Sequence, residues 1–216
     1  MTQSLLESPV RTETDRRVGA LLETIVRKPD LHVAWLETLS LLEFTGARKI
    51  AGSVLRPDRE VLSHLAEEAR HARFFAALAD RVRGEMSPEA PAAPTVALEG
   101  RAGLLYFHRL DDGIARDVEM RLPPAQRRLA VYYHVTAAIE ERALSMYQLY
   151  NQILRDLDTK LRLDGVIAEE EGHLDEMYAR MAELDPEHGT ARDRYAQLEA
   201  GLFLQFLGAL EKTVAA

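Results

Sequence analysis

Two copies of the pattern Glu-x-x-His constrain this chain more than any other feature of its sequence. The first runs from Glu68 to His71, and the second runs from Glu170 to His173 in the other half of the chain. On an α-helix, residues three positions apart lie on the same face, one turn from each other. Each copy would therefore present one carboxylate and one imidazole side by side, provided that the surrounding residues are helical.

Apolar residues recur at helical spacing through most of the chain, and no segment alternates as a half-buried strand does. The sequence therefore predicts an all-α protein. Helices are expected at residues 12–27, 29–55, 59–83, 98–120, 125–157, 159–184 and 190–213. Pro29 would open the second helix, and Asp58 would cap the third. The boundary near residues 156–160 carries neither Pro nor Gly, so the start of the sixth helix is set only loosely.

Residues 29–83 and 125–184 have the pattern of two helical hairpins of the same design. In each, the first helix carries a glutamate on its apolar face, Glu43 or Glu140, and the second carries Glu-x-x-His. At about 1.5 Å per residue, Glu43 and Glu68 lie at similar heights on either side of the break near Pro57. We expect a single domain over residues 1–216, with a crossover at 84–124 and a C-terminal helix at 190–213.

Four carboxylates and two imidazoles would then meet at one level of the helical core. They are Glu43, Glu68, His71, Glu140, Glu170 and His173. Four carboxylates cannot all stay ionised in an apolar interior without cations, because isolated buried charge is very costly. Two divalent cations would balance them, and oxygen and nitrogen ligands suit iron or manganese better than a soft metal.

The assignment depends on choosing among neighbouring glutamates. Glu140 shares a helix face with apolar side chains, whereas Glu141 has a more polar surround. Glu43 is preferred to Glu37 because the small residue Gly46 beside it leaves room for a metal. The remaining glutamates next to the motifs are expected to point sideways or outward: Glu67, Glu169 and Glu171.

Other polar residues near the motifs have ordinary interpretations. Tyr147 is a core aromatic that could donate a hydrogen bond to a ligand. Arg70 is expected either to pair with Asp111 or Asp112 or to be solvated. His134 is interpreted as a core histidine with its hydrogen bonds satisfied. No cluster of ligands is expected around the remaining histidines, His32, His64, His108 and His188.

The ordered set of six residues resembles the ferritin-like di-iron carboxylate superfamily, in which two helices each give a Glu and two each give Glu-x-x-His. The resemblance covers roughly residues 29–181. It implies a ferritin-like four-helix bundle that holds two iron ions, or a manganese–iron pair, on these residues. The strings Ile139-Glu140, followed by Tyr147 and Tyr150, and Glu170-x-x-His173-Leu174 are also similar to those of aldehyde-deformylating oxygenases.

This resemblance leaves several functions open. An oxidase or oxygenase would use O₂ and an external electron donor to attack a small or aliphatic substrate. A ferroxidase or a rubrerythrin-like protein would handle iron or remove peroxide instead. A helical scaffold could also keep the pattern without the metal, because Glu and His three apart on a helix are usually a solvated pair.

Composition excludes several classes of protein and of binding site. The net charge of −8 argues against a nucleic-acid surface, and the lack of cysteine removes disulfides, iron–sulfur clusters and thiolate zinc sites. No segment has the apolar length of a membrane span or a signal peptide, so a cytoplasmic protein is expected. The apolar run at 201–208 is interpreted as core or as the interface of a homodimer.

Overall fold

The structure is a computed structural model that describes residues 9–86 and 96–216. Within these ranges it contains seven α-helices and no strand, so the predicted all-α class is confirmed. The helices are α1 (Pro9–Val26), α2 (Pro29–Ser53), α3 (Arg59–Glu85), α4 (Gly100–Arg121), α5 (Pro124–Asp156), α6 (Asp164–Leu184) and α7 (His188–Ala215). Most of the predicted loop at 84–96 lies outside the described residues.

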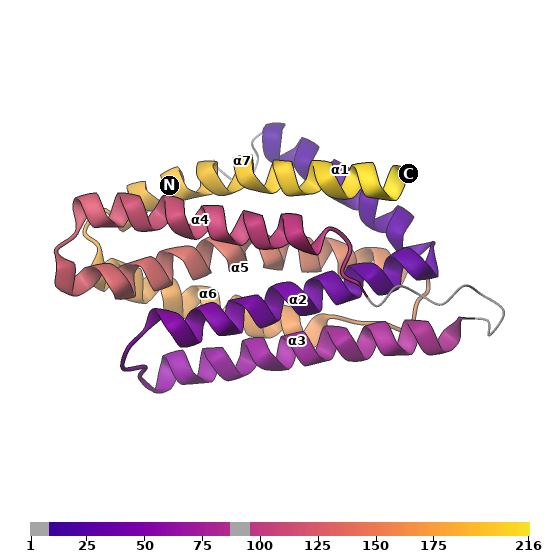
Figure 1. The fold of residues 1–216 in the computed structure, drawn as a ribbon, viewed down its shortest axis with the longest axis horizontal. Coiled ribbons are helices and arrows are strands. Elements are labelled where there is room, and N and C mark those ends of the chain that lie inside the picture. The colour runs from indigo at the N-terminus through magenta and orange to yellow at the C-terminus, as the bar shows by residue number, and fades with distance from the viewer. Residues whose placement is uncertain (1–8, 87–95) are drawn as a thin grey trace.

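Helices α2 and α3 form the first hairpin, and α5 and α6 form the second (Figure 1). Pro29 begins α2, as predicted, because its missing N–H and fixed φ suit the first helical position. Asp58 caps α3 by accepting a hydrogen bond of 3.0 Å from the Val61 backbone N–H. Helix α4 links the two hairpins and packs against α5 and α7 (Figure 1).

The sixth helix begins five residues later than the sequence suggested. The predicted start at residue 159 is wrong, because Asp158 takes a left-handed conformation with φ of 51°. The Asn151 side chain accepts a hydrogen bond from the Leu163 N–H and donates one to Asp164. One side chain of α5 thus fixes the start of α6, without the Pro or Gly that usually marks such a break.

Apolar side chains fill the space on both sides of one polar layer. The larger cluster includes Trp35, Leu36 and Phe75, and a smaller cluster includes Ile50 and Met177. Glutamate and histidine side chains from α2, α3, α5 and α6 lie between these two clusters. The bundle therefore encloses this polar layer in hydrocarbon.

The C-terminal apolar run contributes to the core of this chain. Phe203, Phe206 and Leu207 are buried, and both phenylalanine rings contact Tyr106 of α4. In the described ranges, no helix combines the length and hydrophobicity that crossing a membrane requires.

Candidate metal centre

Both Glu-x-x-His motifs lie on helices and point into the interior. Glu68 and His71 lie on α3, and Glu170 and His173 lie on α6. Glu43 on α2 and Glu140 on α5 face the same region. All six predicted residues are at most 8% exposed, although glutamate is almost never buried unless it is paired.

The potential ligand atoms form two groups, and within each group they lie within 4.8 Å of one another. The Glu43 group consists of Glu43, Glu68, His71 and Glu170, and the His64 group consists of His64, Glu68, Glu140 and His173. Glu68 belongs to both groups, so the two positions are adjacent. Either group offers the carboxylate and imidazole donors that iron and manganese accept.

These groups hold most of the buried polar atoms that have no hydrogen-bond partner. The described residues contain nine such side-chain atoms, and seven of them belong to the two groups. They are His64 Nε2, Glu68 Oε1, His71 Nδ1, both carboxylate oxygens of Glu140, Glu170 Oε2 and His173 Nδ1. Several of these atoms face one another, as His64 Nε2 and a Glu140 oxygen do at 2.7 Å, without the geometry of a hydrogen bond. Because a buried polar atom without a hydrogen bond costs about 1–3 kcal/mol, their convergence indicates that a cation fits here.

The two histidines of the motifs are supported by carboxylates in a crossed arrangement. Nε2 of His71 lies 2.7 Å from Glu169 on α6, and Nε2 of His173 lies 2.8 Å from Glu67 on α3. Each of these carboxylates directly precedes the motif glutamate of the opposite helix. Their bonds leave Nδ1 of both rings facing the central carboxylates, as in histidines that bind a metal with one nitrogen and a carboxylate with the other.

Arg70 links the two supporting carboxylates. Its guanidinium lies 3.0 Å from Glu169 and 4.0 Å from Glu67. The expected pairing of Arg70 with Asp111 or Asp112 is therefore wrong, and Asp111 pairs with Lys49 instead. The distance in sequence between Arg70 and Glu169 explains the error, since only packing of α3 beside α6 brings them together.

His64 is the residue that sequence reasoning missed. Its Nε2 lies 2.7 Å from Glu140 and 3.3 Å from Glu68, and its Nδ1 lies 2.8 Å from the Tyr132 hydroxyl. The expectation that His64 has no cluster around it is wrong. The sequence did contain a pattern that could have identified His64. It precedes Glu68 by four residues and therefore lies on the same helix face.

Glu43 is held by a tyrosine on α5. The Tyr147 hydroxyl donates a hydrogen bond to Glu43, as its position had suggested, and its ring packs against Phe75. One turn after Glu43, a side chain at Gly46 would place Cβ 3.1 Å from Glu68 Oε2. The absence of a side chain at Gly46 therefore leaves Glu68 free to reach both groups.

Burial and mutual repulsion favour the protonated form of Glu43 and Glu140, whereas at Glu170 burial is outweighed by contacts with His173 and His71, which lower its pKa. Desolvation, with the charges of Glu68 and Glu170, raises the pKa of Glu43 well above its usual range. Burial likewise raises the pKa of Glu140 to about 8, although His64 opposes this shift. Burial disfavours charge on His64 too, but its contacts with Glu140 and Glu68 raise its pKa to about 10. Either shared protons or bound cations could neutralise these carboxylates.

Neighbouring candidates have other partners. Glu141 accepts hydrogen bonds from Tyr178 and Arg192, and Glu37 accepts one from Arg83. Nε2 of His134 lies 3.0 Å from Asp185, so its interpretation as a satisfied core histidine is confirmed. These residues lie outside the two groups.

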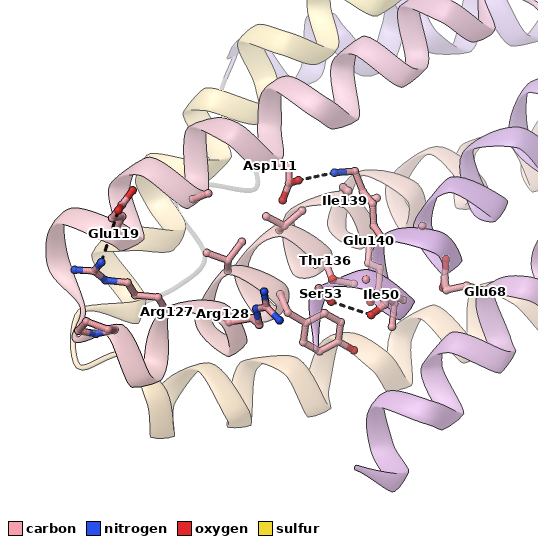
Figure 2. Close-up of a pocket in the computed structure, with 18 residues that line it drawn as sticks. Ile50, Ser53, Glu68, Asp111, Glu119, Arg127, Arg128, Thr136, Ile139 and Glu140 are labelled. Carbon is pink, nitrogen blue, oxygen red and sulfur yellow. Dashed lines mark hydrogen bonds and ion pairs between the residues drawn. The ribbon is translucent and has the colours of Figure 1, made fainter. Parts of the chain in front are cut away.

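Two cavities reach the groups from different sides. One, of about 540 Å³, lies between α2, α4 and α5 and is lined by Glu68 and Glu140 (Figure 2). The other, of about 570 Å³, lies at the α3 and α6 face and is lined by His64, His173 and several carboxylates. The buried groups are therefore accessible both to ions and to small molecules.

Comparison with known proteins adds no family to this description. The chain matches no protein-family model, no curated protein and no solved structure. The geometry and chemistry of the described residues alone indicate a metal centre.

Proposed function

We propose that this chain is a ferritin-like four-helix protein that binds two metal ions and oxidises a small or aliphatic organic substrate with O₂. Two iron ions, or a manganese–iron pair, suit the donor set of carboxylates and imidazoles. The observation that carries the proposal is the convergence of seven unpartnered buried atoms from α3, α5 and α6 beside a cavity. Apart from the additional His64, the order of ligands along the four helices is that of the ferritin-like di-metal proteins.

Each residue of the two groups has a distinct role in this proposal. Glu43, His71 and Glu170 would hold one ion, His64, Glu140 and His173 would hold the other, and Glu68 would contact both. Bound ferrous iron would supply the binding site and part of the electrons for O₂ reduction, and an external donor would supply the rest. The hydroxyl of Tyr132 orients His64, and that of Tyr147 orients Glu43.

The surrounding side chains suit oxidation of an organic molecule. Hydrocarbon on both sides of the polar layer restricts the approach of water to the two cavities, which limits side reactions of reactive species. The cavity beside Glu68 and Glu140 is of the size of small-molecule sites, which span about 300–1,000 Å³.

A ferroxidase or peroxide-removing protein is the second candidate. The observation that favours it is the cavity at the α3 and α6 face, which is lined by Glu60, Glu67, Glu169 and Glu176. Four carboxylates against one lining arginine, Arg59, give this opening a negative charge that attracts cations, so this face suits the passage of iron ions. A metal-free scaffold remains a third alternative, in which protons alone neutralise the groups.

Metal analysis of the purified protein, followed by exposure of its anaerobic ferrous form to O₂, tests the proposal. We expect two metal ions per chain, a transient absorption after mixing with O₂, and loss of both in Glu68→Gln. Glu171→Gln is the matched control, because Glu171 is exposed and lies beside the motif glutamate. No metal in the wild type, with no effect of Glu68→Gln, would contradict the proposal.

The size of the assembly separates the two iron-using candidates. A large cage that mineralises iron would favour storage, whereas a monomer or homodimer that consumes O₂ only with an organic substrate would favour the oxygenase.

A further inference from the structure

The cavity between α2, α4 and α5 has a chemically graded lining. One end is formed by Glu68 and Glu140 of the candidate metal centre. The wall along α5 carries the apolar side chains of Val131, Val135 and Ile139, and α2 adds Ile50. Cationic side chains lie at the other end, and Figure 2 shows Arg127 and Arg128 across the cavity from Glu68.

The cationic side chains around the cavity are mostly neutralised within the chain. Lys49 Nζ lies 2.5 Å from Asp111, and Arg127 lies 3.7 Å from Glu119. Arg127 also donates a hydrogen bond to the Leu122 carbonyl oxygen. These pairs leave the Lys49 and Arg127 cations with little capacity for an additional anion.

Arg128 differs from its neighbours. It lines the cavity and is exposed, and it has no ion pair or hydrogen bond to any described residue. A guanidinium with all its donors free binds a carboxylate through two parallel hydrogen bonds. The outer end therefore offers a fixed positive charge to an incoming ligand.

The distance between the two ends limits the ligand. Arg128 and Glu140 lie twelve residues apart on the same helix, α5, which corresponds to about 18 Å along its axis. A molecule that spans this length beside Val131, Val135 and Ile139 must be largely apolar along its middle. A small polar acid would reach only one end.

We propose that this cavity takes an amphipathic monocarboxylate, whose carboxylate pairs with Arg128 and whose hydrocarbon tail extends toward Glu68 and Glu140. This inference rests on the proposed function and names the substrate class of that centre. Recognition at Arg128 places the far end of the tail, and not the carboxylate, beside the metal ligands. A long aliphatic amine is expected to bind more weakly than the acid, because the unpaired Arg128 repels an ammonium group at the outer end.

Binding measurements with decanoate, decanol and decylamine test the proposal on the protein as purified. Calorimetric titration is expected to show that decanoate binds most tightly and that decylamine binds most weakly. Arg128→Gln is expected to weaken decanoate binding about tenfold, the size of one lost charge-assisted contact, and to leave decanol unchanged. Arg101→Gln is the matched control, since Arg101 is also an exposed arginine near the start of a helix and lies outside the cavity.

A second variant probes the tail. Thr136 lines the cavity between its two ends, so Thr136→Phe is expected to narrow the channel and to weaken decanoate and decanol alike. Equal affinity of decanoate for the wild type and Arg128→Gln would overturn the proposal, as would tighter binding of decylamine. The surface position of Arg128 keeps this test valid even if Thr136→Phe fails to fold.

Metal content measured on the same samples separates this inference from the proposed function. Two ions per chain without affinity for decanoate would overturn the carboxylate assignment alone. Decanoate binding that depends on Arg128 in a protein that takes up no iron or manganese would overturn the proposed oxidation chemistry alone.

Discussion

This chain has two buried clusters of charged side chains, and their carboxylates are neutralised in different ways. The Arg121 cluster consists of Arg121, Asp117, Asp185, His134 and Tyr195, at the ends of α4, α6 and α7 and the middle of α5. Arg121 lies 2.7 Å from Asp117 and 3.0 Å from Asp185, and His134 lies 3.0 Å from Asp185. In the described part of the chain, no side-chain atom of this cluster is buried without a partner.

The candidate metal centre has no such internal cation. Within the described ranges, Glu43, Glu68, Glu140 and Glu170 form no ion pair with any lysine or arginine, and their charged partners are histidines. Their orphaned oxygens and nitrogens converge. The chain thus places an arginine where a buried carboxylate is structural, and omits one where, in our proposal, the cation comes from solution.

Glu68→Gln should produce the largest difference between the two clusters. The variant removes the carboxylate common to both groups, so stabilisation by added Mn²⁺, about 4 kcal/mol at a thousandfold excess over the Kd, should disappear. Without added metal the variant should be at least as stable as the wild type, because a costly buried charge is gone. Chemical denaturation with and without Mn²⁺ measures both effects. An unchanged response to Mn²⁺ would contradict the proposal that the candidate metal centre, unlike the Arg121 cluster, binds a cation from solution.

Asp185→Asn, in the Arg121 cluster, should destabilise the protein and leave its response to Mn²⁺ unchanged. The variant leaves Arg121 with Asp117 as its close carboxylate and leaves His134 without one, so we expect a loss of about 3 kcal/mol in the free energy of unfolding at neutral pH. Mn²⁺ should stabilise this variant as much as the wild type. Parallel denaturation curves with and without Mn²⁺ check this expectation.

The effect of Asp185→Asn should also depend on pH. Burial opposes the charged form of Asp185, but hydrogen bonds from the Glu187 N–H, Arg121 and His134 lower its pKa below the ordinary value of 3.8. Because the folded-state pKa is lowered, this carboxylate stabilises the protein above the unfolded-state pKa and loses that effect as the pH falls through the folded-state pKa. The gap between wild type and variant should therefore close at acid pH. A gap that stays constant down to pH 3 would show that Asp185 acts through packing instead.

His64→Gln tests whether the residue missed in the sequence belongs to the metal centre. Glutamine keeps an acceptor for Tyr132 but removes the imidazole, so affinity for one of the two ions should fall about 100-fold or more, beyond the usual effect of an outer hydrogen-bond partner. The other ion should bind as before. Calorimetric titration with Mn²⁺ would then resolve one tight and one weak site. Two undisturbed sites would return His64 to an ordinary core role.

The crossed supports of the two histidines predict a smaller and position-specific effect. Glu67→Gln should weaken the ion held by His173 about 10–100-fold, and Glu169→Gln should weaken the ion held by His71 by a similar factor. Anomalous diffraction from Mn²⁺-soaked crystals reports occupancy at each position. Loss of the same ion in both variants would contradict the crossed arrangement.

Sequence reasoning reached the helices and most of the site, for a local reason. Periodicity places Glu68 and His71 on one face of α3, and the same spacing applies to Glu170 and His173 on α6. Choosing Glu140 over Glu141 required only the apolar character of the flanking face. His64 lies on the same α3 face but was set aside, because Glu140 and Tyr132, which give it significance, are distant in sequence.

Contacts between residues distant in sequence explain the other differences between the structure and the predictions from sequence. The start of α6 depends on Asn151 of α5, and the partner of Arg70 depends on the packing of α3 beside α6. In both cases a side chain chooses among several possible partners, and the choice is made by geometry that no local pattern encodes.

By itself, the sequence determined the all-α class, the two hairpins and six inward-facing residues, because helical periodicity and charge are properties of the local chain. Only the tertiary structure decided which carboxylates share a position, which nitrogen of each histidine faces inward, and that Arg128 ends a cavity leading to Glu140. These features arise from contacts between helices, where a displacement of a few ångströms changes which atoms meet.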